Sequence, residues 1–229
     1  MSVTELAIKA SVWILPLLLA ITLHEAAHGY AAWKLGDDTA YRMGRVTFNP
    51  LRHIDPVGTL LVPALLLLGS GGRVMFGFAK PVPVNFRRLR NPRGDMVLVA
   101  AAGPGTNLAL ALISALLFHI VPFLPPVLDS WVFNNLYNSV WLNVILAIFN
   151  MLPIPPLDGG RVAVGLLPDS LAMPLARLER FGVFIVLGAI FLLPWVGGQV
   201  GLDLNVFKVL IGEPADYIVF LIMKIAGVG

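Results

Sequence analysis

The stretch that decides the fold of this protein is residues 6–33, which read LAIKASVWILPLLLAITLHEAAHGYAAW. It is longer than the roughly 20 apolar residues that an α-helix needs to cross the hydrocarbon core of a bilayer. Near its end, segment 24–28 (HEAAH) places three ionisable side chains in this apolar run. Such groups are costly in lipid unless they have a partner. We therefore predict a membrane-spanning helix with a functional site inside the membrane, close to the face where Lys34 ends the run.

The spacing of the two histidines in segment 24–28 indicates a metal site. Side chains four residues apart lie on one face of a helix, so His24 and His28 can reach one Zn²⁺ together. Glu25 lies one step round the helix, where a carboxylate can serve as the general base toward a water nucleophile. The structural alternative, histidines that only pack against other helices, supplies no partner for these groups in lipid.

Composition places the chain in a bilayer and excludes several chemistries. Hydrophobic residues make up 58% of the sequence, charged residues make up 13%, and the mean hydropathy is +0.84, values typical of an integral membrane protein. The formal charge of +3 comes from Lys and Arg beside apolar runs, where they set membrane orientation, so we predict no nucleic-acid partner. The absence of cysteine excludes disulfides, thiolate zinc sites and cysteine nucleophiles.

The apolar pattern predicts an all-α polytopic membrane protein in one membrane-embedded domain, 1–229. Firm spans are expected at 6–33, 96–121, 133–150 and 181–195, with an interfacial helix at 168–180 and an irregular polar patch at 103–107 inside the second span. Residues 57–69 and 199–226 are apolar but interrupted, so the expected total is about five to six membrane segments. Alternating residues at 74–86 predict a short membrane-associated β-hairpin, with prolines on one edge.

Basic residues predict the orientation of the chain. They cluster in 34–56, 87–93 and 161–180, and by the positive-inside rule these connections lie in the cytoplasm. The N-terminus is then outside, segment 57–86 dips into the membrane and returns, and the metal site lies near the cytoplasmic face. We expect the cell membrane as the location.

A hydrolytic zinc site needs a third protein ligand. Segment 150–161 reads NMLPIPPLDGGR, and its three prolines cannot continue a helix. Irregular backbone at membrane depth needs a protein-lined or wet interior, and Asp158 follows it at the depth of His28. His53, in a basic loop, and His119, at the opposite end of the second span, are the alternatives, but each is more ordinary as a solvated or interfacial histidine.

Three motifs together give the chain a resemblance to a known family. The HEAAH motif at 24–28, the pattern NxxPxPxxDG at 150–159 and, between them, GxxxN at 103–107 resemble the site-2 protease family of intramembrane zinc metalloproteases. The resemblance covers a catalytic core of about 6–165. It departs from larger members of the family because no stretch of the sequence fits a PDZ or CBS domain.

The resemblance implies a set of roles for individual residues. It implies that His24, His28 and Asp158 bind one Zn²⁺ per chain and that Glu25 is the general base. It also implies that Asn107 and Asn150 help to bind or polarise the substrate peptide. The implied partners are the lipid bilayer and a transmembrane protein substrate, which would be cleaved within or near its membrane segment.

Other functions are compatible with ionisable groups in a membrane. A metal transporter would repeat such ligands along a path and would show internal symmetry, whereas this sequence has one cluster and no repeat. A di-iron membrane oxygenase needs more histidines than the four present. A catalytically inert scaffold derived from a protease remains a third alternative, and the presence of Glu25 argues against it.

Overall fold

The fold was described from a computed structural model, which describes residues 3–61, 65 and 80–228. Within those residues all regular secondary structure is helical. The long helices are α1 (Val3–Lys34), α4 (Pro92–Leu117) and α5 (Pro126–Asn150). The C-terminal part contains α6 (Asp158–Leu166), α7 (Asp169–Arg177), α8 (Glu179–Leu187), η5 (Gly188–Leu192), α9 (Leu193–Gln199), η6 (Lys208–Gly212) and α10 (Glu213–Ile225). Shorter elements are α2 (Thr39–Arg42), η1 (Pro50–Arg52), η2 (Pro56–Leu61), η3 (Phe86–Arg88) and η4 (Phe118–Phe123).

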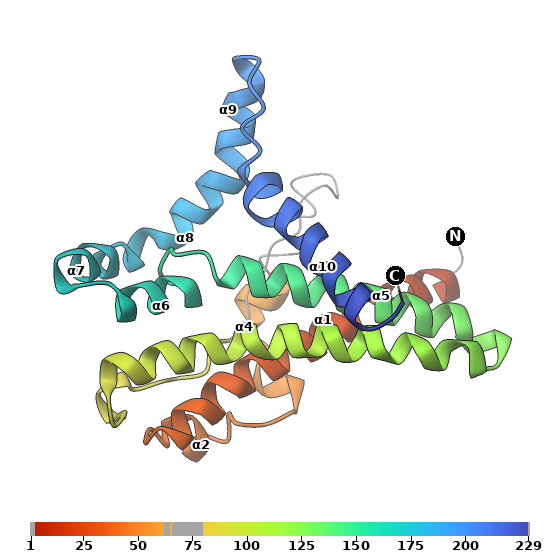
Figure 1. The fold of residues 1–229 in the computed structure, drawn as a ribbon, viewed down its shortest axis with the longest axis horizontal. Helices are drawn as coiled ribbons and strands as arrows, with labels where there is room; N and C mark the ends of the chain where they lie inside the picture. Colours follow the sequence, from red (N-terminus) through yellow and green to blue (C-terminus); the bar gives the residue numbers. More distant parts are fainter. Residues whose placement is uncertain (1–2, 62–64, 66–79, 229) are drawn as a thin grey trace.

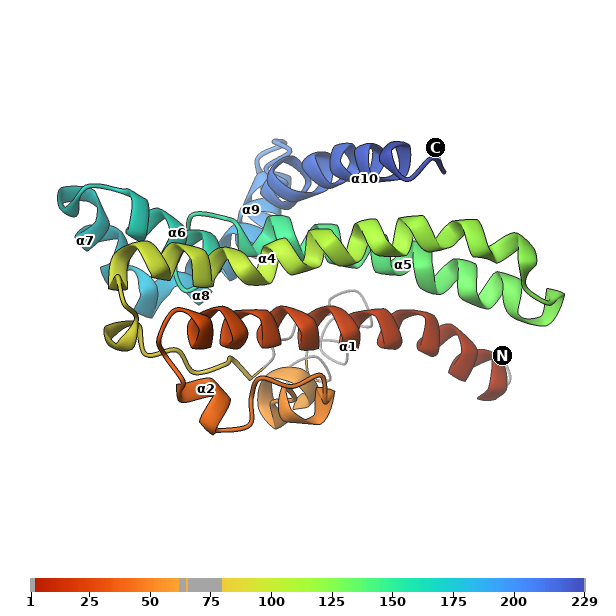
Figure 2. The ribbon, with the colours of Figure 1, turned by 60° about the horizontal axis from the view of Figure 1, so that its bottom comes forward.

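Helices α1, α4 and α5 form the centre of the molecule, and each of them packs against the other two. Figure 2 shows α1 on one side of the α4–α5 pair and α10 on the opposite side. Helices α8 and α9 extend away from this group, at the top of Figure 1. The centre of the molecule is therefore a three-helix unit, and α6 contacts α4 at one end of it.

Four helical segments of the described chain are long and apolar enough to cross a membrane. They are Ala10–Lys34, Pro92–Phe123, Pro126–Asn150 and Glu179–Gln199. These correspond to the four firm spans predicted from the sequence, and α7 occupies the predicted interfacial helix. The higher count of five to six is not confirmed, because the helical stretch 206–225 carries too many charged residues to qualify as a span and most of 57–69 lies outside the described residues.

Helix α4 begins at a strong start signal and continues through the motif that we expected to be irregular. Asn91 caps the helix by accepting a hydrogen bond from the Gly94 amide, and the Asp95 carboxylate accepts one from the Asn91 amide. The helix then runs without interruption through 103–107. The prediction of an irregular patch is therefore wrong. A proline inside a membrane helix is tolerated where neighbouring groups satisfy the backbone hydrogen bonds.

The proline-rich segment ends α5, as the sequence predicts, and directs the chain into α6. Helix α5 ends at Asn150, and α6 begins at Asp158 after an irregular connection. The first turn of α6 lies so close to this connection that side chains do not fit: a Cβ on Gly159 would lie 2.1 Å from the Met151 carbonyl oxygen, and one on Gly160 would lie 2.2 Å from the Pro155 nitrogen. Close packing on glycine therefore fixes the start of α6.

The predicted β-hairpin is not confirmed. Residues 74–79 fall outside the described part of the chain, and residues 80–85 form an extended segment without strand pairing. The extended segment is anchored instead by hydrogen bonds to α1 and to the connections that follow it. Two of these run from Arg45 Nη2 to the Lys80 carbonyl, 2.7 Å, and from the Asn85 amide to Asp37 Oδ2, 2.6 Å.

Candidate metal centre

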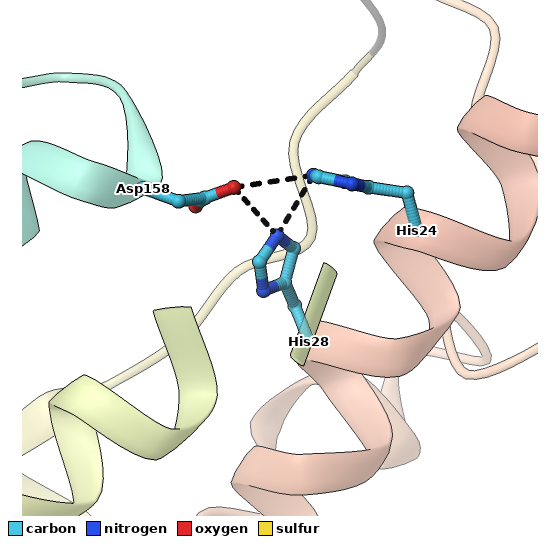
Figure 3. A group of neighbouring side chains, drawn as sticks. All are labelled: His24, His28 and Asp158. Carbon is cyan, nitrogen blue, oxygen red and sulfur yellow. Dashed lines mark hydrogen bonds and ion pairs between the residues drawn. The ribbon is translucent and has the colours of Figure 1, made fainter. Parts of the chain in front are cut away.

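Helices α1 and α6 bring three potential metal ligands together. His24 and His28 lie one turn apart on α1, and Asp158 is the first residue of α6. Figure 3 shows the two imidazoles and the carboxylate converging on one point. The two Nε2 atoms are 3.0 Å apart, and Asp158 Oδ2 lies 3.2 Å from one and 3.3 Å from the other. In the described residues this is the one group of His, Asp or Glu side chains that could hold a metal ion.

Hydrogen bonds at the far side of each imidazole fix which nitrogen carries the proton. His28 Nδ1 lies 2.7 Å from the Val99 carbonyl oxygen, and a carbonyl can only accept, so this Nδ1 is the N–H. His24 Nδ1 lies 2.6 Å from Asn107 Oδ1, which is also an acceptor. A neutral imidazole has a single N–H. Both Nε2 atoms therefore present a lone pair to the point of convergence.

This arrangement fits a zinc ion by two criteria. Three lone pairs meet with no proton between them, and Asp158 Oδ2 is buried without a hydrogen-bond partner, so a cation is needed to offset their repulsion. Zinc bonds of about 2.0–2.1 Å in a tetrahedron place ligand atoms roughly 3.3 Å apart, and the three separations of 3.0–3.3 Å match one face of such a tetrahedron.

Glu25 is held beside this group by the extended segment 80–85. The Val82 amide donates a hydrogen bond to Glu25 Oε2 at 2.7 Å. Pro81 and Pro83 flank Val82 and have no amide proton, so the segment presents one donor to the carboxylate. The backbone of the segment thereby fixes the orientation of Glu25.

The end of segment 80–85 depends on a buried carboxylate outside the membrane span. Asp37 has no exposed surface and accepts hydrogen bonds from the Thr39 amide and hydroxyl and from the Asn85 amide. Burial alone would raise the pKa of Asp37. The hydrogen bonds from Thr39 and Asn85, together with the nearby charge of Arg88, hold this pKa below its ordinary value of 3.8. Ionised Asp37 therefore stabilises the connection between α1 and the segment.

A cavity of about 530 Å³ opens onto the three ligands, within the range of binding sites for small molecules or peptide side chains. Most of its wall is apolar. The polar exceptions are His24, Glu25, His28, Asn150, Asp158 and Arg161. The cavity therefore brings an apolar surface and a few convergent polar groups to one place.

The structure separates the two asparagines for which the resemblance implies contact with substrate. Asn150 lines the cavity, and its Nδ2 donates to the Leu146 carbonyl one turn back in α5. Asn107 has no exposed surface and lies behind His24, with its Oδ1 on the imidazole and its Nδ2 on Asn143. Asn107 thus contacts His24 from behind, and Asn150 lies on the cavity wall.

The two alternative histidine ligands lie elsewhere. His53 is buried, and its Nε2 is 3.1 Å from the Thr47 carbonyl oxygen. His119 Nε2 is 2.7 Å from the Ala226 carbonyl oxygen near the end of α10. Neither belongs to the metal-capable group, whose third member is Asp158.

Several residues at the site were not found by the sequence reasoning. Val99 contributes only a backbone carbonyl, and Val82 contributes only a backbone amide, so their side chains carry no signal. Asn143 does carry one, because a polar residue in an apolar span indicates function, and it precedes Asn150 by seven residues, which is about two helical turns. Gly103 was recognised as part of a motif. The sequence does not show, however, that its missing side chain leaves room for the imidazoles of His24 and His28 where α4 packs on α1.

Comparison with known proteins gives the chain a family. Residues 126–193 match the model of Peptidase family M50. The Bacillus subtilis protein YwhC, whose name assigns it provisionally to the zinc metalloproteases, is 40% identical over 185 residues, which cover 79% of this chain and 80% of YwhC. The similarly named Rip2 of Mycolicibacterium smegmatis is 31% identical over 170 residues, 74% of this chain and 62% of Rip2.

Rip2 of Mycobacterium tuberculosis H37Rv is 30% identical over 181 residues, which cover 79% of this chain and 66% of that protein. The chain thus spans somewhat less than two thirds of the length of the two mycobacterial relatives. No solved structure gives a significant match. The extent of the match with YwhC and the match to the family model lead to one conclusion: the chain belongs to Peptidase family M50, the site-2 protease family of zinc metalloproteases.

Proposed function

We propose that this protein is an intramembrane zinc endopeptidase that hydrolyses peptide bonds within or near the transmembrane segments of other membrane proteins. The observation that carries the proposal is the convergence of three potential metal ligands on an apolar cavity: His24 and His28, with Glu25 beside them, lie on a helix long enough to span a bilayer, and Asp158 meets them from the start of α6. An apolar wall suits a substrate that arrives from lipid, and the polar groups suit hydrolysis of its amide bond.

Each residue of the site has a separate role in the proposed reaction. His24, His28 and Asp158 would hold Zn²⁺, which when bound supplies Lewis-acid polarisation of the scissile carbonyl. Glu25 takes a proton from the attacking water and returns it to the departing amine. Asn150, on the cavity wall, donates from its amide to the carbonyl oxygen of the substrate and stabilises the negative charge that develops there without adding a charge of its own.

Substrate must unwind before it can react. An amide in a helix is shielded, and unwinding it in lipid leaves backbone donors and acceptors without partners, at several kcal/mol each. Residues 80–85 are extended and line the cavity through Pro81, Val82 and Val84, so an unwound peptide can lie beside them and exchange backbone hydrogen bonds. We therefore propose that segment 74–86, of which 80–86 belongs to the described chain, presents the substrate to the metal centre.

The orientation of the protein follows from its charges. The connections after α1 and before α4 and the region of α6 and α7 carry the basic residues, which places them in the cytoplasm by the positive-inside rule. The metal centre would then lie near the cytoplasmic face of the cell membrane, because His28 is close to the Lys34 end of α1.

The test is cleavage of single-span reporter proteins in proteoliposomes. Reporters with a helix-destabilising residue at successive depths are incubated with the zinc-loaded enzyme, and mass spectrometry of the products locates the bond that is cut. We expect cuts inside or at the edge of the span. We also expect Glu25→Gln to lower the rate by about 10²- to 10⁴-fold and to retain zinc, because Gln cannot accept the proton.

The matched control is Glu179→Gln, which neutralises an exposed glutamate whose carboxylate lies 3.8 Å from the Arg161 guanidinium. It should leave cleavage unchanged. Cuts confined to water-exposed regions of the reporters would refute the intramembrane assignment. A Glu25→Gln variant with the wild-type rate would refute the role of Glu25 as general base.

A further inference from the structure

A continuous chain of buried polar side chains leads from the metal centre into the membrane interior. His24 Nδ1 meets Asn107 Oδ1 at 2.6 Å, Asn107 Nδ2 donates to Asn143 Oδ1 at 2.8 Å, and Asn143 Nδ2 donates to the Ser139 carbonyl oxygen at 2.9 Å. The Ser139 hydroxyl lies 2.7 Å from that of Ser114 on α4. Asn107 is 0% exposed and Asn143 is 1% exposed, so these two amides are closed to solvent, and the chain links α1, α4 and α5.

The direction of the hydrogen bonds made by the two asparagine amides is set by the Ser139 backbone carbonyl. The Ser139 carbonyl can only accept, so Asn143 must turn its Nδ2 toward Ser139 and its Oδ1 toward Asn107. Asn107 must then turn its Nδ2 toward Asn143, which leaves its Oδ1 facing the imidazole. An acceptor at that position requires the N–H of His24 on Nδ1 and leaves Nε2 free for the metal.

We propose that Asn143 is a positioning residue of the metal centre, which fixes the orientation of the Asn107 amide and through it the tautomer and ring orientation of His24. The other acceptor for Asn107 Nδ2, the Ala20 carbonyl, is 3.4 Å away, at the limit of a hydrogen bond. Without Asn143 the Asn107 amide can flip and present Nδ2 to His24, which favours the tautomer with its proton on Nε2, the atom that faces the metal.

The tautomer of His28 does not depend on a side-chain amide. His28 Nδ1 donates to the Val99 backbone carbonyl, which belongs to α4 and cannot flip. The two zinc-binding histidines therefore differ in kind: the tautomer of one is fixed by a backbone group, and that of the other is fixed by two side-chain amides in series. Only the tautomer of His24 can be changed by substituting a side chain that lies two hydrogen bonds away from the ligand.

The inference rests on the proposed ligand set, and zinc affinity is the readout that tests both. We expect Asn143→Leu to weaken zinc binding about ten- to hundredfold, the usual effect of losing a group that orients a ligand, as measured by chelator competition in detergent. Asn143→Asp, as the neutral acid that burial favours, keeps an oxygen facing Asn107 Nδ2 and an O–H for the Ser139 carbonyl, and is expected to restore most of the affinity. If Asn143→Leu does not fold, Asn143→Ser replaces it, because a serine hydroxyl is too short to reach Asn107.

The matched control is Asn138→Leu. Asn138 is also a buried asparagine of α5, and its Nδ2 donates to the Val12 carbonyl of α1 at 2.8 Å, but it is not part of the chain that leads to His24. A purely structural role predicts equal losses of thermal stability and zinc affinity for both substitutions. The positioning role predicts that zinc affinity falls for Asn143→Leu and stays within about twofold of wild type for Asn138→Leu.

Ring ¹⁵N spectra distinguish a change in the tautomer of His24 from a general loosening of the metal centre. The chain has four histidines, so ring ¹⁵N labelling gives four imidazole spin systems, and spectra are recorded before and after zinc is added. In zinc-free Asn143→Leu the His24 signals should show a second form with its proton on Nε2, a form that bound zinc excludes, while the His28 signals stay as in wild type. Unchanged affinity and an unchanged His24 spectrum in Asn143→Leu would overturn the inference, whereas zinc binding that survives Asp158→Ala undiminished would overturn the ligand set itself.

Discussion

The packing of α4 on α1 makes a sharp prediction for Gly103→Ala. A Cβ at this position would lie 2.4 Å from His28 Nε2, 2.6 Å from His28 Cε1 and 2.6 Å from His24 Cε1. Ordinary contact between such atoms begins at about 3.5 Å, so the added methyl group or the imidazoles must move by roughly 1 Å. Metal-ligand distances tolerate deviations of only about 0.2 Å. We therefore expect Gly103→Ala to weaken zinc binding by at least about tenfold, the lower end of the effect of disturbing a ligand's support.

Helix propensity alone predicts that Gly103→Ala is favourable, so the experiment can tell the two lines of reasoning apart. Gly103 lies inside α4, where Gly→Ala usually stabilises a helix by about 0.5–1 kcal/mol. Gly105 lies in the same helix two residues away, and a Cβ there would meet no atom within 4 Å. Gly105→Ala should therefore keep wild-type zinc affinity and unfold at the same temperature or slightly higher. Zinc affinity by chelator competition and thermal unfolding in detergent are measured for both variants, and equal zinc affinity of Gly103→Ala and Gly105→Ala would refute the reasoning.

Three further predictions follow from the site and its supports. Asp158→Ala should lose zinc during dialysis against a chelator that wild type resists, whereas Asp169→Ala, at an exposed position, should retain it; equal retention would place the third ligand elsewhere. The pKa of Asp37 is lowered on folding, so its stabilising effect is present above about pH 3.8 and is lost as pH falls through the lower folded pKa. The difference in unfolding midpoint between wild type and Asp37→Asn should accordingly be constant from neutral pH to about pH 4 and shrink below it, and a difference that grows on acidification contradicts the assignment. Gly160→Ala should destabilise the protein through its clash with the Pro155 backbone, while Gly198→Ala, with open space around it, should not; similar unfolding midpoints for the two would show that α6 can move away from the connection.

The positions of the long helices could be predicted because their signal is local. An apolar run of sufficient length spans a membrane whatever surrounds it, and the prolines after Asn150 end a helix for reasons confined to their own rings. The same locality explains the error at 103–107. That patch looked irregular because glycine and proline weaken an isolated helix, but α4 is held by its neighbours and continues. The hairpin inferred from alternation is not confirmed: residues 74–79 lie outside the described part of the chain, and the described residues 80–85 form hydrogen bonds with Glu25, Asp37 and Arg45.

The sequence by itself determined that this protein lies in a membrane, that two histidines share one helical face with a glutamate beside them, and that Asp158 follows a broken helix. These conclusions depend on composition and on spacing along a single helix. Tertiary structure alone decided that Asp158 meets both imidazoles, that Gly103 leaves room for them, and that Asn107 faces His24 and not the cavity. Each of these contacts joins residues from different helices, and the distance and direction of such a contact depend on how the helices pack, which no local pattern of residues encodes.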